Sequence, residues 1–280
     1  MADVAPAAGL AVVDFSGTLS LGAVEFATPG RLGVELRRSG LAELGIATPE
    51  VFWDALVNPT WEPGSTTGIG YVDVLTDAAV GHLAGRRDID RATLRAAVQR
   101  FADGYFAAST IMPAWWPWLR RLWELPATAV VVATDHYAEA TDRVAEQIVA
   151  TGLPAAPLEA AEARTAILVA NSADIGHHKR SRPFWDAVAA VVGRVGCVAA
   201  IDDFGANEPG ADAYADRELV EQRRRAVTTL LAGVFEAPVV ICPFAVPDDG
   251  DPTPAVDRAG GRAVAALSQS WPPTRCQVHP

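Results

Sequence analysis

The stretch AVVDFSGTLS, residues 11–20, runs from an apolar segment into Asp14 and then into a turn of serine, glycine and threonine. A nearly continuous apolar run is typical of a strand that is buried on both faces of a parallel sheet. In such sheets, ligands bind beside the loops that follow the carboxyl ends of the strands. Asp14 is therefore the first candidate for a functional residue.

Four further apolar runs follow, and each is short and bounded by turn residues. Patterns typical of amphipathic helices separate the later runs, and this alternation indicates a parallel sheet covered by helices. We therefore predict an α/β protein with a doubly wound, Rossmann-like core. The predicted strands are residues 10–15, 127–134, 166–170, 196–202 and 237–242, and the predicted helices between the later strands are residues 138–151, 183–193 and 217–233.

The connection between the first and second predicted strands is far longer than one crossover needs. Helical patterns fill it, and one helix begins with Thr48 as its N-cap and Pro49 at its first position. We predict an inserted helical cap subdomain over the carboxyl edge of the sheet. The predicted domains are a core of residues 1–19 and 112–245, a cap of residues 20–111 with further helices near 70–84 and 90–108, and a tail of residues 246–280.

The tail is rich in proline, glycine and aspartate at residues 246–256, which indicates a flexible linker. We expect a short helix over residues 256–268 and a disordered end after it. Upstream, Pro113 begins a tryptophan-rich helix, PAWWPWLRRLWEL, that leads back into the core.

Composition excludes several function classes. The chain has 280 residues, half of them hydrophobic, which is enough for a large core. Its net charge of −11 argues against a nucleic-acid or anionic-membrane surface. The cysteines Cys197, Cys242 and Cys276 form no CxxC pair, so we expect reduced thiols. No basic leader or apolar span is evident, and we expect a cytoplasmic protein.

Polar residues stand where four of the predicted strands end. Asp14 ends the first strand, Thr134 ends the second, Lys179 lies just beyond the third, and Asp202 and Asp203 end the fourth. A carboxylate nucleophile, a hydroxyl donor, one ammonium group and an acidic pair are together suited to holding Mg²⁺ and a phosphoryl group. The pattern therefore indicates phosphoryl chemistry at this edge of the sheet.

Lys179 is the only lysine among 23 lysine and arginine residues, and its flexible point charge differs chemically from a planar guanidinium. This exception favours a functional role. The neighbouring His177 and His178 are adjacent, and adjacent residues seldom chelate one ion without further ligands. We expect them to be solvated loop histidines or to contact the substrate.

The ordered set of motifs resembles that of the haloacid dehalogenase-like (HAD) hydrolases. The resemblance spans residues 9–245, and the inserted helical segment lies where this family places a C1-type cap. The first motif is matched by Asp14, Ser16, Gly17 and Thr18 in DFSGT, the second by Thr134, the third by Lys179 in GHHKRSRPFW, and the fourth by Asp202, Asp203 and Asn207.

The resemblance implies that Asp14 forms an aspartyl-phosphate with Mg²⁺ as the cofactor. It implies that Asp203 binds the metal directly and Asp202 binds it through water. The implied metal ligands are Asp14, the backbone carbonyl of Ser16, Asp202, Asp203 and Asn207. The implied phosphate-binding residues are Gly17, Thr18, Thr134, Asp135 and Lys179.

Ser16 departs from the family pattern, because its phosphatases usually have aspartate there as general acid and base. A serine hydroxyl holds no proton that exchanges near neutral pH. Either another group, such as Asp135, His136 or a cap residue, takes this role, or the leaving group is activated, or the phosphoryl group passes to an acceptor other than water.

We expect a phosphohydrolase that acts on a small phosphorylated metabolite. A phosphoryl transferase and a low-turnover phosphate-binding protein of the same fold are the alternatives. A dehalogenase is less expected, since carbon–halogen displacement needs no Mg²⁺ and the acidic pair is intact.

Overall fold

A computed structural model describes residues 9–85, 90–160, 162–208, 219–247 and 250–269 of the chain. Across these residues, one six-stranded sheet is wholly parallel and has the strand order β3-β4-β2-β1-β5-β6. The strands are β1 Gly9–Asp14, β2 Thr128–Thr134, β3 Ala155–Pro157, β4 Ile167–Asn171, β5 Val198–Asp202 and β6 Val239–Pro243.

The five strands expected from the apolar runs are confirmed, each with its ends within two residues of those predicted. The sixth strand, β3, was not predicted. It is a half-buried edge strand of only three residues, Ala-Ala-Pro, and this composition carries no strand signal.

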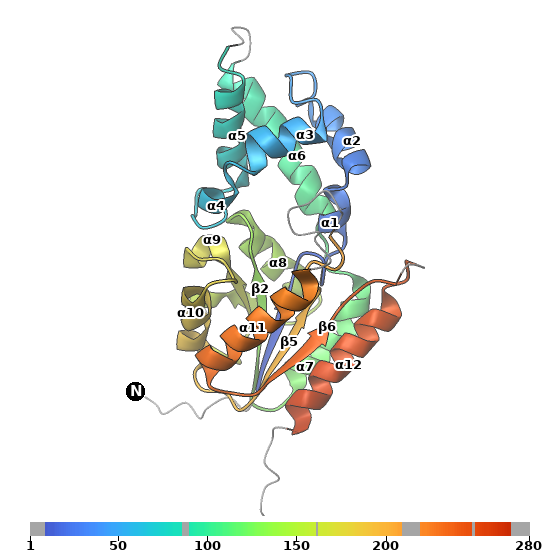
Figure 1. Cartoon of the computed structure of the whole chain (residues 1–280), viewed down its shortest axis with the longest axis vertical. Helices are drawn as coiled ribbons and strands as arrows, with labels where there is room; N and C mark the ends of the chain where they lie inside the picture. Colours follow the sequence, from blue (N-terminus) through green and yellow to red (C-terminus); the bar gives the residue numbers. More distant parts are fainter. Residues whose placement is uncertain (1–8, 86–89, 161, 209–218, 248–249, 270–280) are drawn as a thin grey trace, which may run out of the picture.

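Helices cover both faces of the sheet, as expected for a doubly wound α/β core (Figure 1). Along β1, Ala11 and Val13 face one side, while Leu10 and Val12 face the other. The first face packs against α7 (Trp116–Glu124), α8 (Glu139–Val149) and α12 (Thr253–Gln269), and the second packs against α10 (Arg182–Val192) and α11 (Val220–Phe235).

The strand order changes direction beside β1. The chain proceeds from β1 to β2 and β4 on one side, and it then crosses to β5 and β6 on the other. The loops that follow β1 and β5 therefore diverge, which is where open α/β sheets bind ligands. Because Val13 is in register with Ile201, the next residues, Asp14 and Asp202, leave the sheet side by side.

The helix predicted over residues 256–268 is confirmed, but it begins at Thr253, inside the segment predicted as a linker, and it packs on the core. Helix α12 is 17 residues long and buries Ala255, Val256 and Leu267 in the same apolar cluster as the sheet. A Cβ at Gly260 would lie 2.5 Å from the ring of Trp118, so glycine there lets α12 approach α7 closely. Residues 253–269 are thus part of the core. The expected disordered end, with Cys276, falls outside the described residues.

The segment between β1 and η2 (Pro113–Trp115) is mostly helical, and we call residues 22–108 the helical insert. It packs around an apolar cluster of its own, which includes Leu36, Phe52, Leu75 and Phe101. Figure 1 shows it beyond one end of the sheet. Its elements are α1 Gly22–Phe26, α2 Pro29–Ser39, α3 Pro49–Val51, the π-helical turn η1 Phe52–Val57, α4 Trp61–Gly64, α5 Tyr71–His82 and α6 Arg91–Ala108.

The predicted helix start at Thr48 and Pro49 is confirmed. Thr48 caps α3, since its Oγ1 accepts a hydrogen bond of 3.3 Å from the backbone N–H of Val51. Asp90 caps α6 in the same way through Thr93. None of the helices in the described ranges has the length and apolar character to cross a membrane.

Candidate active site

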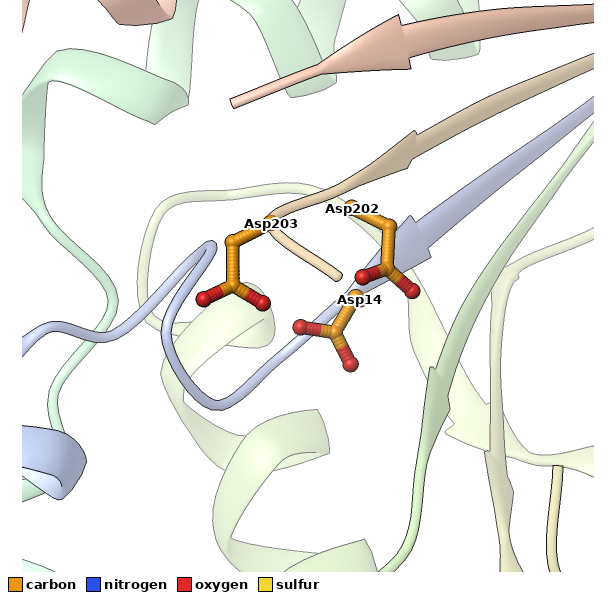
Figure 2. Close-up of side chains that lie close together, drawn as sticks. All are labelled: Asp14, Asp202 and Asp203. Atoms are coloured by element: carbon orange, nitrogen blue, oxygen red, sulfur yellow. The ribbon is translucent and has the colours of Figure 1, made fainter. Parts of the chain in front are cut away.

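Three carboxylates converge at the point where the sheet changes direction. Asp14 ends β1, Asp202 ends β5, and Asp203 follows it. One oxygen of each lies within 4.8 Å of the other two, and Figure 2 shows the three side chains facing a common space. Asp14 and Asp203 are each only 5% exposed, so water screens this cluster poorly. We call these three residues the acidic edge.

Ionising all three carboxyl groups of the acidic edge costs free energy. Burial and the neighbouring charge of Asp14 raise the pKa of Asp202 to about 8 and that of Asp203 to about 6. Buried like charges favour protonation unless a cation compensates them. The site therefore holds more negative charge than its own residues neutralise.

Lys179 is brought to the acidic edge by the loop after β4 and the short helix α9 (Ser172–Ile175). Its Nζ contacts Asp14 Oδ1 and lies 3.8 Å from Asp202 Oδ2. Burial alone would lower the pKa of Lys179, but the carboxylates around it raise this pKa, so the amine stays charged. Lys179 therefore lies beside both Asp14 and Asp202, the acidic residues with which the sequence grouped it.

The backbone of Lys179 is also held in place. Its N–H donates to Asp135 Oδ1 at 2.8 Å, and its carbonyl accepts from Trp185 Nε1 at 2.6 Å. Burial raises the pKa of Asp135, against the opposing effect of Lys179. Asp135 therefore orients the loop that carries the lysine, and its predicted contact with phosphate stays a prediction.

The turn after β1 fits tightly under Asp203. Gly17 has a φ of 77°, and a Cβ there would lie 2.6 Å from Asp203 Oδ2, so both conformation and space require glycine. The buried Thr18 Oγ1 accepts the backbone N–H of Asp203 at 3.0 Å. Ser16 is partly exposed and forms an isolated bridge with Ser20. Thr18 thus positions the acidic edge, and phosphate binding by Gly17 and Thr18 stays a prediction.

Asn207 links the loops around the acidic edge. Its backbone N–H donates to Asp203 Oδ2 at 3.0 Å, and Gly205 N–H donates to the other oxygen at 3.1 Å. Its side-chain Nδ2 donates to Gly17 O at 2.7 Å, and its Oδ1 accepts from Val246 N–H at 2.9 Å. These contacts assign Asn207 a supporting role, whereas its role as a metal ligand stays a prediction.

The end of β2 contributes Thr134 and the residues after it. Thr134 is buried and lies opposite Asn171 of β4, and its predicted bond to phosphate is not tested by these contacts. His136 is buried and turned toward the helical insert, with Nε2 2.6 Å from the hydroxyl of Tyr105. Burial lowers the pKa of His136 to about 4. It is therefore neutral near pH 7, which disfavours it as the group that replaces the acid missing at Ser16.

Sequence reasoning missed one buried residue of the site. His178 was expected to be solvated or near the substrate, and it is only 4% exposed, whereas His177 is exposed. Its ring contacts α4 of the helical insert. No local pattern distinguishes the two histidines, because burial is decided by a segment more than a hundred residues away.

The acidic edge fits a hard divalent cation such as Mg²⁺. The donors are carboxylate oxygens, which are the protein ligands this cation prefers, and a Cβ at Gly17 would crowd one of them. In comparisons with known proteins, no family model matches this chain, and no curated protein matches it.

Proposed function

We propose that the protein is a Mg²⁺-dependent phosphohydrolase of the HAD type that acts on a small soluble phosphate ester, with the helical insert as its cap. The observation that carries this proposal is a cluster of three carboxylates, two of which lie beside the chain's only lysine, at the point where the sheet changes direction. A buried excess of negative charge beside one fixed ammonium suits a site that takes up a cation together with a phosphate.

Asp14, Asp202 and Asp203 would hold the metal, with the Ser16 carbonyl and Asn207 as further proposed ligands. When bound, Mg²⁺ would offset the repulsion between the carboxylates and a phosphate dianion. Asp203 is kept in one orientation by two backbone N–H donors, so its oxygens are preorganised for such a ligand.

Asp14 would act as the nucleophile. One of its oxygens forms a bond to phosphorus, the bond from phosphorus to the leaving oxygen breaks, and the leaving group departs with the electron pair. Water then attacks phosphorus of the aspartyl-phosphate, loses a proton to solvent, and releases phosphate with the Asp14 carboxylate restored. Lys179 is placed to balance charge on the phosphoryl oxygens during both steps, and Thr134 is the proposed hydroxyl donor.

Ser16 shapes the choice of leaving group. It offers no carboxyl group to protonate a departing alkoxide, so esters whose leaving group is stable as an anion are the favoured substrates. The same residue supports the alternative of a phosphoryl transferase, because nothing at this position activates water. A low-turnover phosphate-binding protein is the remaining alternative.

Phosphate release from a panel of esters, with and without Mg²⁺, tests the proposal. We expect metal-dependent release by the wild type and none by Asp14→Asn. Asp186→Asn is a matched control, because Asp186 is exposed, pairs with Arg182 on α10 and is not one of the three residues of the acidic edge. Equal inertness of wild type and Asp14→Asn across aryl, acyl and alkyl phosphates would contradict hydrolysis.

A further inference from the structure

We propose that His178 is a positioning residue that couples the helical insert to Lys179. The effect of this coupling on catalysis rests on the proposed function. The coupling itself rests only on the contacts between the insert and the core. It is carried by a set of hydrogen bonds between residues 61–65 of the insert, which are α4 and the residue after it, and residues 172–180 of the core.

The side chain of His178 is enclosed by the helical insert. Its Nε2 lies 2.7 Å from Ser65 Oγ, and its ring stacks on Trp61 at 6.3 Å between centroids and 8° between planes. Ser65 Oγ donates to the carbonyl of Trp61, so it accepts from the Nε2–H of His178. The histidine is thus bound to the insert by a buried hydrogen bond of defined direction.

Glu62 adds a second contact to the same loop. Its carboxylate lies 3.5 Å from His178 Nδ1 and 2.8 Å from a guanidinium nitrogen of Arg180. Glu62 and Arg180 are both exposed, and an exposed ion pair contributes little to stability. The buried bond of His178 to Ser65 is therefore the main tie, and the residues on both sides of Lys179 contact α4 or its neighbour.

Ser172, at the start of the segment of residues 172–180, also binds Ser65. Ser172 Oγ donates to the backbone carbonyl of Ser65 at 2.6 Å and accepts the N–H of His136 at 3.0 Å. Ser65 thus contacts the first residue of α9 with its carbonyl and His178 with its hydroxyl. The loop that carries Lys179 is held at both ends by one residue of the insert.

The charge of Lys179 makes this placement matter. Its Nζ contacts Asp14 and lies 3.8 Å from Asp202, and electrostatic interactions between buried groups vary strongly with distance. A displacement of about 1 Å in a catalytic group costs on the order of 10²-fold in rate. Holding the loop through His178 therefore lets the insert determine whether Lys179 is in position.

Lys179 can be followed directly, because it is the only lysine in the chain. Reductive methylation of the folded full-length protein without added metal, read by peptide mass spectrometry, reports how freely its amine reacts. The α-amine of Met1 is read on a separate peptide. We expect His178→Ala to speed labelling of Lys179 by about tenfold, the scale of one lost hydrogen bond.

Two matched variants control this experiment. His178→Gln retains a donor toward Ser65 and is expected to label nearly as slowly as the wild type. His177→Ala alters the exposed neighbour and is expected to label at the wild-type rate. If His178→Ala is not folded, Ser65→Ala removes the same bond from the other side. Wild-type labelling rates in a folded His178→Ala or Ser65→Ala would overturn the coupling.

A double-mutant cycle with Lys179→Ala tests the catalytic consequence. If His178 acts through Lys179, His178→Ala lowers kcat with KM little changed in the wild-type background, and it has no further effect in the Lys179→Ala background. Equal losses in both backgrounds would indicate a general structural role and overturn the positioning role. Failure of the wild type to release phosphate would refute the proposed function, and the labelling result would still decide the coupling.

Discussion

The acidic edge and the contact between the helical insert and the core treat polar groups in opposite ways. At the acidic edge, three carboxylates lie together, one lysine pairs with two of them, and two of the carboxyl pKa values are raised. At the insert, His136 meets the Tyr105 hydroxyl and His178 meets Ser65, each through one hydrogen bond. The acidic edge keeps negative charge that only a ligand can neutralise. At the contact between insert and core, the histidines are paired by hydrogen bonds within the protein.

This difference separates function from support in physical terms. A buried polar group that is paired by a hydrogen bond costs little, whereas a buried unpaired charge is costly and persists only where something compensates it. Residues of the acidic edge should therefore respond strongly to added ligands. Substitutions at the contact between insert and core should change the free energy of unfolding and the positions of the loops that these residues hold.

The largest expected effect comes from adding a carboxyl group to the acidic edge. Ser16→Asp supplies a proton donor beside Asp14, and we expect kcat/KM for alkyl phosphates to rise by about 10²–10⁴-fold. Aryl phosphates, whose leaving group needs no proton, should gain much less. Steady-state assays on a matched ester pair measure this, with Ser16→Asn as the control of similar size. Equal behaviour of the two variants would show that another group already supplies the proton.

The second prediction concerns protonation of His136, at the contact between the core and the helical insert. The folded protein binds a proton on His136 only near pH 4, whereas the unfolded chain binds it near 6.5. The free energy of unfolding should therefore fall as pH decreases from 6.5 to 4, by up to about 3 kcal/mol from this residue. Urea unfolding across this range should give a flatter profile for His136→Gln.

The exposed His82 supplies the control for that measurement. His82→Gln should retain the wild-type dependence of stability on pH. If His136→Gln and His82→Gln give the same profile as the wild type, then His136 is not a buried neutral group, and the contrast with the acidic edge fails there.

The third prediction tests whether the acidic edge is compensated by a cation. At Mg²⁺ concentrations of about 100 times Kd, the wild type should gain about 2.7 kcal/mol in free energy of unfolding. Asp202→Asn should lose most of this gain. In the absence of metal the same variant should be more stable than the wild type at alkaline pH, since Asp202 with a raised pKa must ionise there at a cost.

Unfolding of both proteins with Mg²⁺ or with chelator measures these opposite effects. Asp186→Asn on α10 serves as the control and should follow the wild type under both conditions. A variant Asp202→Asn that is less stable without metal and equally stabilised by it would show that the carboxylate is structural.

The smallest expected effect belongs to a helix cap at the contact between the helical insert and the core. Both carboxylate oxygens of Glu139 in α8 accept the N–H of Tyr71, at 2.9 and 2.7 Å, at the N-terminus of α5. Glu139→Ala should cost about 1 kcal/mol in free energy of unfolding, the usual value of a lost cap. Thermal or urea unfolding measures it, with the exposed Glu146→Ala on the same helix as the control. A loss no larger than that of Glu146→Ala would show that this cap does not stabilise the protein.

The strands and the site residues at their ends were predictable because both depend on local pattern. A strand covered on both faces must be apolar along its length, and its last residue is fixed by where that run stops. Asp14, Thr134, Asp202 and Asp203 were located in this way. Lys179 lies in a loop, and its position near the strand ends was inferred from its rarity and its motif rather than from periodicity.

Features that depend on distant partners were not predictable. Helix α12 was predicted as a short helix within a tail, and its packing on the core was not predicted, because only the contact of Trp118 with Gly260 shows that this helix belongs to the core. His178 carries the same local signals as His177, and only the position of α4 buries one of them.

The sequence by itself determined a parallel α/β sheet and the acidic residues that leave its carboxyl edge, because a continuous apolar run indicates a strand buried on both faces and its end locates the next polar residue. Tertiary structure alone decided which groups meet. Lys179 contacts Asp14 across 165 residues, Glu139 caps α5 across 68, and Ser65 holds His178 across 113. These pairs form because packing of the insert and of the sheet brings distant segments of the chain together. A local sequence pattern carries no information about such contacts.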